Sequence, residues 1–160
     1  MPKSLILGFV IGGLAVVAAI VVLASSGGMP KSEIEAAQAA FRSLIGHCLE
    51  NRAEAGIPLL DVQMMLRYEK PDEFKKWKDM TPEQRTGLGP VAFDSVREKV
   101  GKLGIKDPAG ADALLAAAVA TPDSRTMQVQ YEMKAGEVSW NATLSKRDSG
   151  WQLVRLDAIR

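Results

Sequence analysis

The sequence predicts an α+β protein with one N-terminal transmembrane helix, a helical region, and a C-terminal three-stranded antiparallel meander packed on a long amphipathic helix. The first observation is an uninterrupted apolar run over Leu5–Ala24, which has no ionisable side chain. The second is a series of helix-type apolar patterns between residues 32 and 120, separated by glycine and proline. The third is a change of period after Met127, where every second residue becomes apolar, as in a half-buried strand.

The apolar run is long enough to cross a bilayer. At ~1.5 Å per residue it makes a helix of roughly 30 Å, which matches the hydrocarbon core. A cleaved signal peptide has an apolar region of only about 7 to 15 residues, so an uncleaved signal anchor over residues 1–24 is the better interpretation. The small residues Val22 and Ala24 leave cleavage near Ser25 as the alternative.

The basic residues beside the run indicate its orientation. Lys3 and the α-amino group lie on the short side, whereas acidic residues accompany Lys31 on the other side. Because basic residues favour the cytoplasmic side, we expect a cytoplasmic N-terminus. Residues 23–26 also resemble a bacterial lipoprotein signal in which Ser26 replaces the lipidated cysteine. The expectation is a single-pass protein of the bacterial inner membrane with its C-terminal domain in the periplasm.

Small side chains recur along one face of this helix, at Gly8, Gly12, Ala15 and Ala19. Helices in lipid associate through close backbone approach across such faces, which predicts docking against another membrane helix or a second copy. Glycine and alanine are also common in membrane spans, so ordinary composition is the alternative.

Residues 25–31 are a short Gly/Ser-rich linker, and residues 32–160 have the length of one soluble α+β domain. Lys3 is the only charged residue before Met29, so residues 29–160 carry 19 basic and 19 acidic side chains, which cancel. This balance argues against binding to nucleic acid or to an anionic lipid surface. The single Cys48 excludes an intramolecular disulfide.

The first soluble helix is expected to begin at Ser32, which forms a capping box with Glu35, and to end before Gly56 and Pro58. Its apolar side chains share one stripe: Ile34, Ala37, Phe41, Leu44, Ile45, Cys48 and Leu49. Further helices are expected over residues 59–68, briefly from Pro71, after the cap Thr81 with Pro82 in first position, over 93–103, and over 108–120.

Three strands are expected near the C-terminus, over residues 127–133, 138–144 and 151–159, joined by turns at 134–136 and 147–150. Their alternation gives the sheet one apolar and one polar face. The first soluble helix is the natural cover for the apolar face.

No catalytic constellation stands out. His47 and Cys48 are neighbours on a helix, where side chains point ~100° apart, so they cannot form a dyad. Cys48 is expected in the core and His47 at the surface. With one histidine and one cysteine in the chain, a transition-metal site is not expected. The carboxylates form no close acid–base pair, and we expect neither a cofactor nor an enzyme.

An apolar cluster in the helical region is the candidate interface or ligand pocket. Its members are Met64, Met65, Tyr68, Phe74 and Trp77. The same residue types also form ordinary cores, which is the alternative interpretation.

The C-terminal strands carry a spaced set of aromatic, glycine and aliphatic positions: Tyr131, Gly136, Val138, Leu144, Gly150 and Trp151. With the preceding amphipathic helix, this pattern resembles the membrane-tethered, cone-shaped domains of the nuclear-transport-factor-two-like superfamily. The resemblance implies a cone-shaped α+β fold. Residues 57–120 depart from it, because they are expected to be helical where such domains have an early strand or hairpin. Enzymes of the superfamily use an acidic residue, His or Tyr inside the cone, and none of these roles transfers here.

These features favour a non-enzymatic, membrane-anchored accessory or assembly subunit of a larger membrane protein complex. Its partners are expected to be other membrane proteins and the lipid bilayer. The alternative is a tethered pocket domain that binds a small apolar ligand, or an isomerase-like enzyme of the cone-shaped fold.

Overall fold

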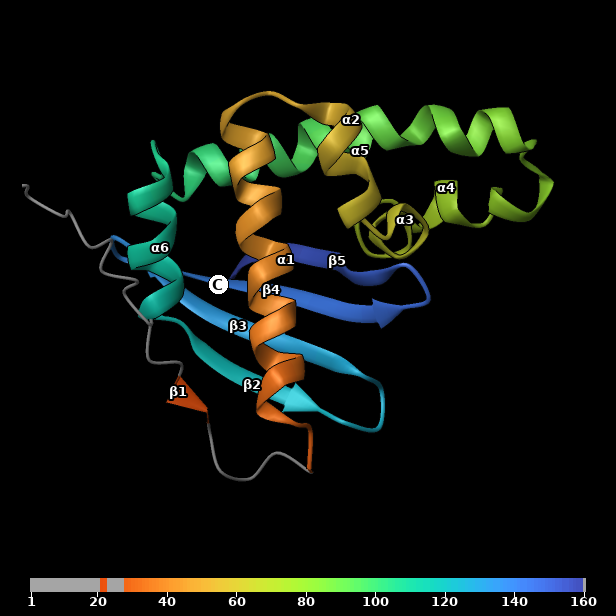
Figure 1. The fold of residues 1–160 in the computed structure, drawn as a ribbon. Helices are drawn as coiled ribbons and strands as arrows, with labels where there is room; N and C mark the ends of the chain where they lie inside the picture. Colours follow the sequence, from red (N-terminus) through yellow and green to blue (C-terminus); the bar gives the residue numbers. More distant parts are fainter. Residues whose placement is uncertain (1–20, 23–27, 160) are drawn as a thin grey trace, which may run out of the picture.

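The computed structural model describes residues 21–22 and 28–159, which fold into helices on one face of an antiparallel sheet (Figure 1). Each of the four C-terminal strands pairs antiparallel with the next. These strands are β2 (Val119–Asp123), β3 (Gln128–Ala135), β4 (Val138–Arg147) and β5 (Gly150–Ile159). The α+β class and the C-terminal antiparallel sheet are thus confirmed.

The helical region contains eight described segments. They are α1 (Lys31–Leu49), α2 (Ala53–Gly56), η1 (Ile57–Leu59), α3 (Val62–Glu69), α4 (Pro71–Phe74), η2 (Trp77–Asp79), α5 (Pro82–Lys102) and α6 (Pro108–Ala116). Asp61 caps α3 by accepting from the Met64 N–H at 3.0 Å, and Thr81 and Gln84 form a reciprocal capping box at α5. The cap expected at Thr81 is confirmed.

The expected membrane span and its small-residue stripe lie outside the described residues, apart from Val21 and Val22. These two residues form β1 (Val21–Val22), which pairs parallel with Val119 and Ala120, where a helix had been expected. Within the ranges that the structure describes, no helix combines the length and apolarity needed to cross a membrane.

The alanine-rich helix expected through Ala120 ends at Ala116, and β2 follows from Val119. The helical prediction rested on local propensity, whereas the strand is fixed by pairing with β3, where Ala120 lies opposite the buried Tyr131. Pro122 has no N–H to give to a further strand, which fits a position near the side of the sheet. The sheet therefore has one more antiparallel strand than expected.

The first soluble helix begins within one residue of its expected start, but its expected capping box and its expected end were wrong. α1 begins at Lys31 without a side-chain cap, and Glu35 pairs with Lys31 (3.4 Å) instead of turning back to Ser32. The helix ends seven residues before Gly56, in a Schellman motif around Asn51, whose φ of 52° lies in the left-handed region that asparagine tolerates. The Arg52 N–H closes this motif on the His47 carbonyl at 2.9 Å.

The separate helix expected from residue 93 is the second half of α5, which runs unbroken through Gly87, Gly89 and Pro90. Tertiary packing explains its continuity. A Cβ on Gly89 would lie 3.0 Å from Ile57 Cγ2, so the glycine lets η1 approach closely. Phe93 and Val96, in the following turn of α5, are buried in the core. This tertiary packing overrides the low helix propensity of glycine and proline.

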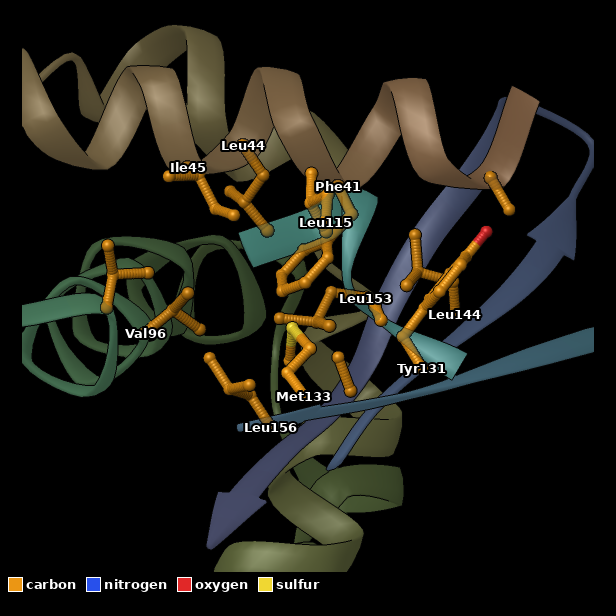
Figure 2. Packing of buried hydrophobic residues seen from close by; sticks show 14 of the residues in the cluster. Phe41, Leu44, Ile45, Val96, Leu115, Tyr131, Met133, Leu144, Leu153 and Leu156 are labelled. Carbon is orange, nitrogen blue, oxygen red and sulfur yellow. The ribbon is translucent and has the colours of Figure 1, made fainter. Parts of the chain in front are cut away.

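Side chains fill the space between α1 and the sheet (Figure 2). Phe41 of α1 stacks on Tyr131 of β3 with ring centroids 6.5 Å apart. The Tyr131 hydroxyl donates to the Ile34 carbonyl at 2.8 Å, so the single polar atom of this ring is satisfied. Met133 and Leu144 are buried beside it, as the alternation predicts.

Candidate functional site

The apolar cluster expected from the sequence does not line one cavity. Met65 is buried and faces a groove between α3 and α5, whereas Tyr68 is 47 % exposed and lines a separate hollow on the sheet. Met64, which directly precedes Met65, is half-buried. The other two aromatic residues lie under arginine side chains.

Phe74 has the Arg67 guanidinium 5.9 Å from its ring centroid, and Trp77 has that of Arg85 at 5.3 Å. Arg85 also donates to the Trp77 carbonyl at 3.2 Å. These contacts tie the α4–η2 segment to α3 and α5, because each aromatic ring has its cation on a neighbouring helix.

The α3–α5 groove is the main candidate site. Its volume is about 350 Å³. It is lined by Val62, Met65, Leu66, Glu69, Lys70, Glu73, Leu88, Val91, Ala92 and Ser95. Aliphatic side chains and Met65 make the floor, and the charged residues of α3 and α4 make one rim. Val91 is 55 % exposed, so apolar surface remains open to solvent at this place.

Close backbone packing positions the groove. Gly56 of α2 lies so near Phe93 that a Cβ there would overlap its ring, and Gly89 lies against Ile57. These two glycines let α5 approach α2 and η1 closely. The part of α5 that carries Leu88, Val91 and Ala92 is thereby held opposite α3.

An ion-pair network closes one end of the groove. Lys99 of α5 lies 2.6 Å from Glu69 of α3 and 3.1 Å from Asp157 of β5, and Arg155 donates to Asp157 at 2.6 Å. Burial acts to raise the pKa of Asp157, but the hydrogen bonds from Arg155 and Lys99 outweigh it, so its pKa lies below the ordinary value. The network joins three elements and keeps its charges paired.

Ser95 and Glu69 are the only hydroxyl–carboxylate pair at the groove rim among its described lining residues. The Ser95 hydroxyl donates to Glu69 Oε2 at 3.2 Å, while the Lys99 ammonium holds Glu69 Oε1 at 2.6 Å. A carboxylate engaged in an ion pair is a poor base for activating a serine. The pair therefore orders the rim, and we assign no covalent chemistry to it.

Cys48 and His47 lie away from the groove. Cys48 is buried, and burial raises the pKa of its thiol to about 12, so it is not a nucleophile at neutral pH. His47 is half-buried, with Nδ1 3.5 Å from Arg52 Nη2. In the described part of the chain, no group of three or more His, Cys, Asp or Glu side chains could hold a metal ion.

Sequence reasoning missed the α5 side of the groove, because Gly87, Gly89 and Pro90 were interpreted as a break. The missed residues are Leu88, Val91, Ala92 and Ser95. Their i, i+3, i+4, i+7 spacing is the helical signal that could have found them.

Comparison of the chain with protein-family models, with curated proteins and with solved structures finds no match. The α3–α5 groove is therefore characterised by its own residues: an apolar floor, a polar rim, and a neighbouring network of paired charges.

Proposed function

We propose that the chain is a non-enzymatic, membrane-anchored accessory or assembly subunit of a larger membrane protein complex. Its N-terminal helix docks against other membrane helices through Gly8, Gly12, Ala15 and Ala19, and its domain, on the periplasmic side of a bacterial inner membrane, docks through the α3–α5 groove.

The observation that carries this proposal is the groove with Val91 on its lip. Apolar surface that stays exposed beside a concave apolar floor is typical of a protein interaction site. A partner's aliphatic or aromatic side chain would fill the floor, and the rim of Glu69, Lys70 and Glu73 would fix its orientation. Such a buried central contact surrounded by polar residues is how many interfaces obtain their affinity.

The packed interior supports an accessory role over an isomerase-like enzyme. A cone-shaped enzyme needs a cavity between its helix and its sheet to hold the substrate. Here Phe41, Tyr131 and Met133 occupy that space and are buried. This packing supports the accessory role over an enzyme of that type.

The test is purification of the full chain from native membranes, with the groove changed by Val91→Asp. The charge on the groove lip should abolish retention of a specific membrane protein, measured by quantitative mass spectrometry of co-purifying proteins. Val138→Asp is the matched control, because Val138 is 45 % exposed but lies in the β3–β4 hairpin. Gly8→Leu with Gly12→Leu should weaken the same association. A wild-type chain that purifies as an isolated monomer would contradict the proposal.

A second candidate function is binding of a small apolar ligand, which the volume of the groove favours. Its roughly 350 Å³ lies within the range of about 300 to 1,000 Å³ common for ligand pockets. Native mass spectrometry of the purified chain distinguishes the two functions. A bound small molecule lost in Val91→Asp, with no co-purifying protein, would favour the ligand.

A further inference from the structure

Helices α1 and α6 cover one face of the sheet (Figure 1). The opposite face carries a regular row of polar side chains. One side chain comes from each antiparallel strand, and each is the register partner of the next. The row is Thr121, Gln130, Thr143 and Arg155. Because register partners have neighbouring Cβ atoms, these side chains stand next to one another across the sheet.

This row forms most of a hollow of about 230 Å³, here called the polar hollow. Asp123 and Gln128, from the adjacent row, extend it, and Tyr68 of α3 closes its end. The Arg155 guanidinium lies 5.4 Å from the centroid of the Tyr68 ring, which places the aromatic wall directly beside the row.

The uncharged side chains of the polar hollow are free to bind a ligand. Those of Thr121, Gln128, Gln130 and Thr143 make no hydrogen bond with any other residue in the ranges that the structure describes. Together they present hydroxyl and amide groups, which both donate and accept.

The two charges at the ends of the hollow already have partners. Arg155 donates to Asp157, and Asp123 accepts from the Arg125 N–H and the Thr126 hydroxyl, both at 2.9 Å. The polar hollow therefore suits a neutral ligand with several hydrogen-bonding groups, and it lacks the surplus charge that an anion or a cation needs.

Ser145 lies on the same face but outside the lining of the polar hollow. Ser145 follows Thr143 by two residues and is the register partner of Gln128, and it is 1 % exposed. Its hydroxyl has no hydrogen-bond partner among the described residues. Because Ser145 is buried and is not among the residues that line the polar hollow, its hydroxyl is not counted as part of the ligand site.

We propose that the polar hollow binds one ring of a neutral saccharide. A sugar ring has hydroxyl groups around its edge, which match the threonine and glutamine side chains. Its apolar C–H faces suit the part of the half-exposed Tyr68 ring that Arg155 leaves uncovered. The volume is below the roughly 300 Å³ at which drug-sized pockets begin, so there is room for a single ring. This site is distinct from the α3–α5 groove and goes beyond the proposed accessory function, because it adds a glycan to the partners.

The test is calorimetric titration of the full chain with maltotriose, cellotriose and chitotriose as probes. The chain is held in lipid nanodiscs, because the head groups of alkyl-glycoside detergents are themselves sugars. We expect one of the probes to bind at millimolar or lower concentration. Gln130→Leu and Thr143→Val should each weaken that binding about tenfold, since each removes hydrogen bonds from the centre of the row.

Glu132→Gln is the matched control, because Glu132 lies on the same strand and face, outside the polar hollow. It should bind like the wild type, and thermal unfolding should show all three variants folded. The proposal is overturned if none of the probes binds, if Gln130→Leu binds as well as the wild type, or if sulfated oligosaccharides bind better than neutral ones. None of these results depends on the co-purification test, so the two proposals can fail separately.

Discussion

Tyr131 shows at the scale of one residue how the helix and the sheet are joined. Its ring packs on Phe41, its hydroxyl donates to the first turn of α1, and burial raises the pKa of the phenol. The sequence alternation could place Tyr131 on the buried face, since period-two patterns depend only on neighbours in the chain. It could not supply the hydrogen-bond partner, because Ile34 is 97 residues away in the sequence.

Tyr131→Phe should therefore lower the free energy of unfolding by about 1 kcal/mol, because one hydrogen bond between buried groups is lost while the ring remains. Urea denaturation followed by tryptophan fluorescence measures this change. Tyr68→Phe is the control, and its exposed hydroxyl should leave the midpoint unchanged. Equal stability of Tyr131→Phe and the wild type would show that the Ile34 contact contributes nothing.

At the scale of elements, the strong apolar periodicities predicted the helix and the strands correctly. The glycine and proline residues of α5 instead predicted a break that the structure does not have. The apolar stripe of α1 and the alternation in β3 and β4 are local, and the structure confirms them. The continuity of α5 and the existence of β2 depend on distant partners: Gly89 against Ile57, and Val119 opposite Glu132. A pattern of neighbours cannot contain that information. For the same reason Met65 was identified as a site residue, whereas Val91 across the groove was not.

Glycine substitutions test how closely α5 is packed. Gly56→Ala should destabilise the fold by about 1 to 3 kcal/mol, because the new methyl group overlaps the fully buried Phe93 ring. Gly87→Ala is the matched control within α5. It has open space around it, so alanine should be neutral or stabilising by about 0.5 to 1 kcal/mol. Thermal and urea unfolding measure both, and a neutral Gly56→Ala would show that α5 can shift away from α2.

For the whole molecule, the ion-pair network around Lys99 links helices to the sheet, because it joins α3, α5 and β5 at the edge of the sheet. The pKa of Asp157 is lower in the folded chain than its ordinary value of 3.8. The unfolded chain therefore binds more protons in this range. The contribution of Asp157 to stability is present above pH 3.8 and is lost as the pH falls through the folded pKa.

Lys99→Met should reduce stability at neutral pH by about 1 kcal/mol, because it leaves Glu69 and Asp157 without their shared cation. It should also reduce the loss of stability seen below pH 4. Lys102→Met is the control, since Lys102 pairs with Glu98 on the exposed side of the same helix. Urea midpoints measured between pH 3 and pH 7 test both effects. An acid profile of Lys99→Met that is identical to the wild type would contradict the assigned role.

The position of Pro122 in β2 has a consequence for how copies of the chain behave together. Beyond Ala120, no further strand lies beside β2 within the described residues. A regular strand there would be a template on which a second molecule could polymerise into a continuous fibre. The imino ring interrupts the row of donors that such growth requires, so concentrated protein is protected from this form of aggregation.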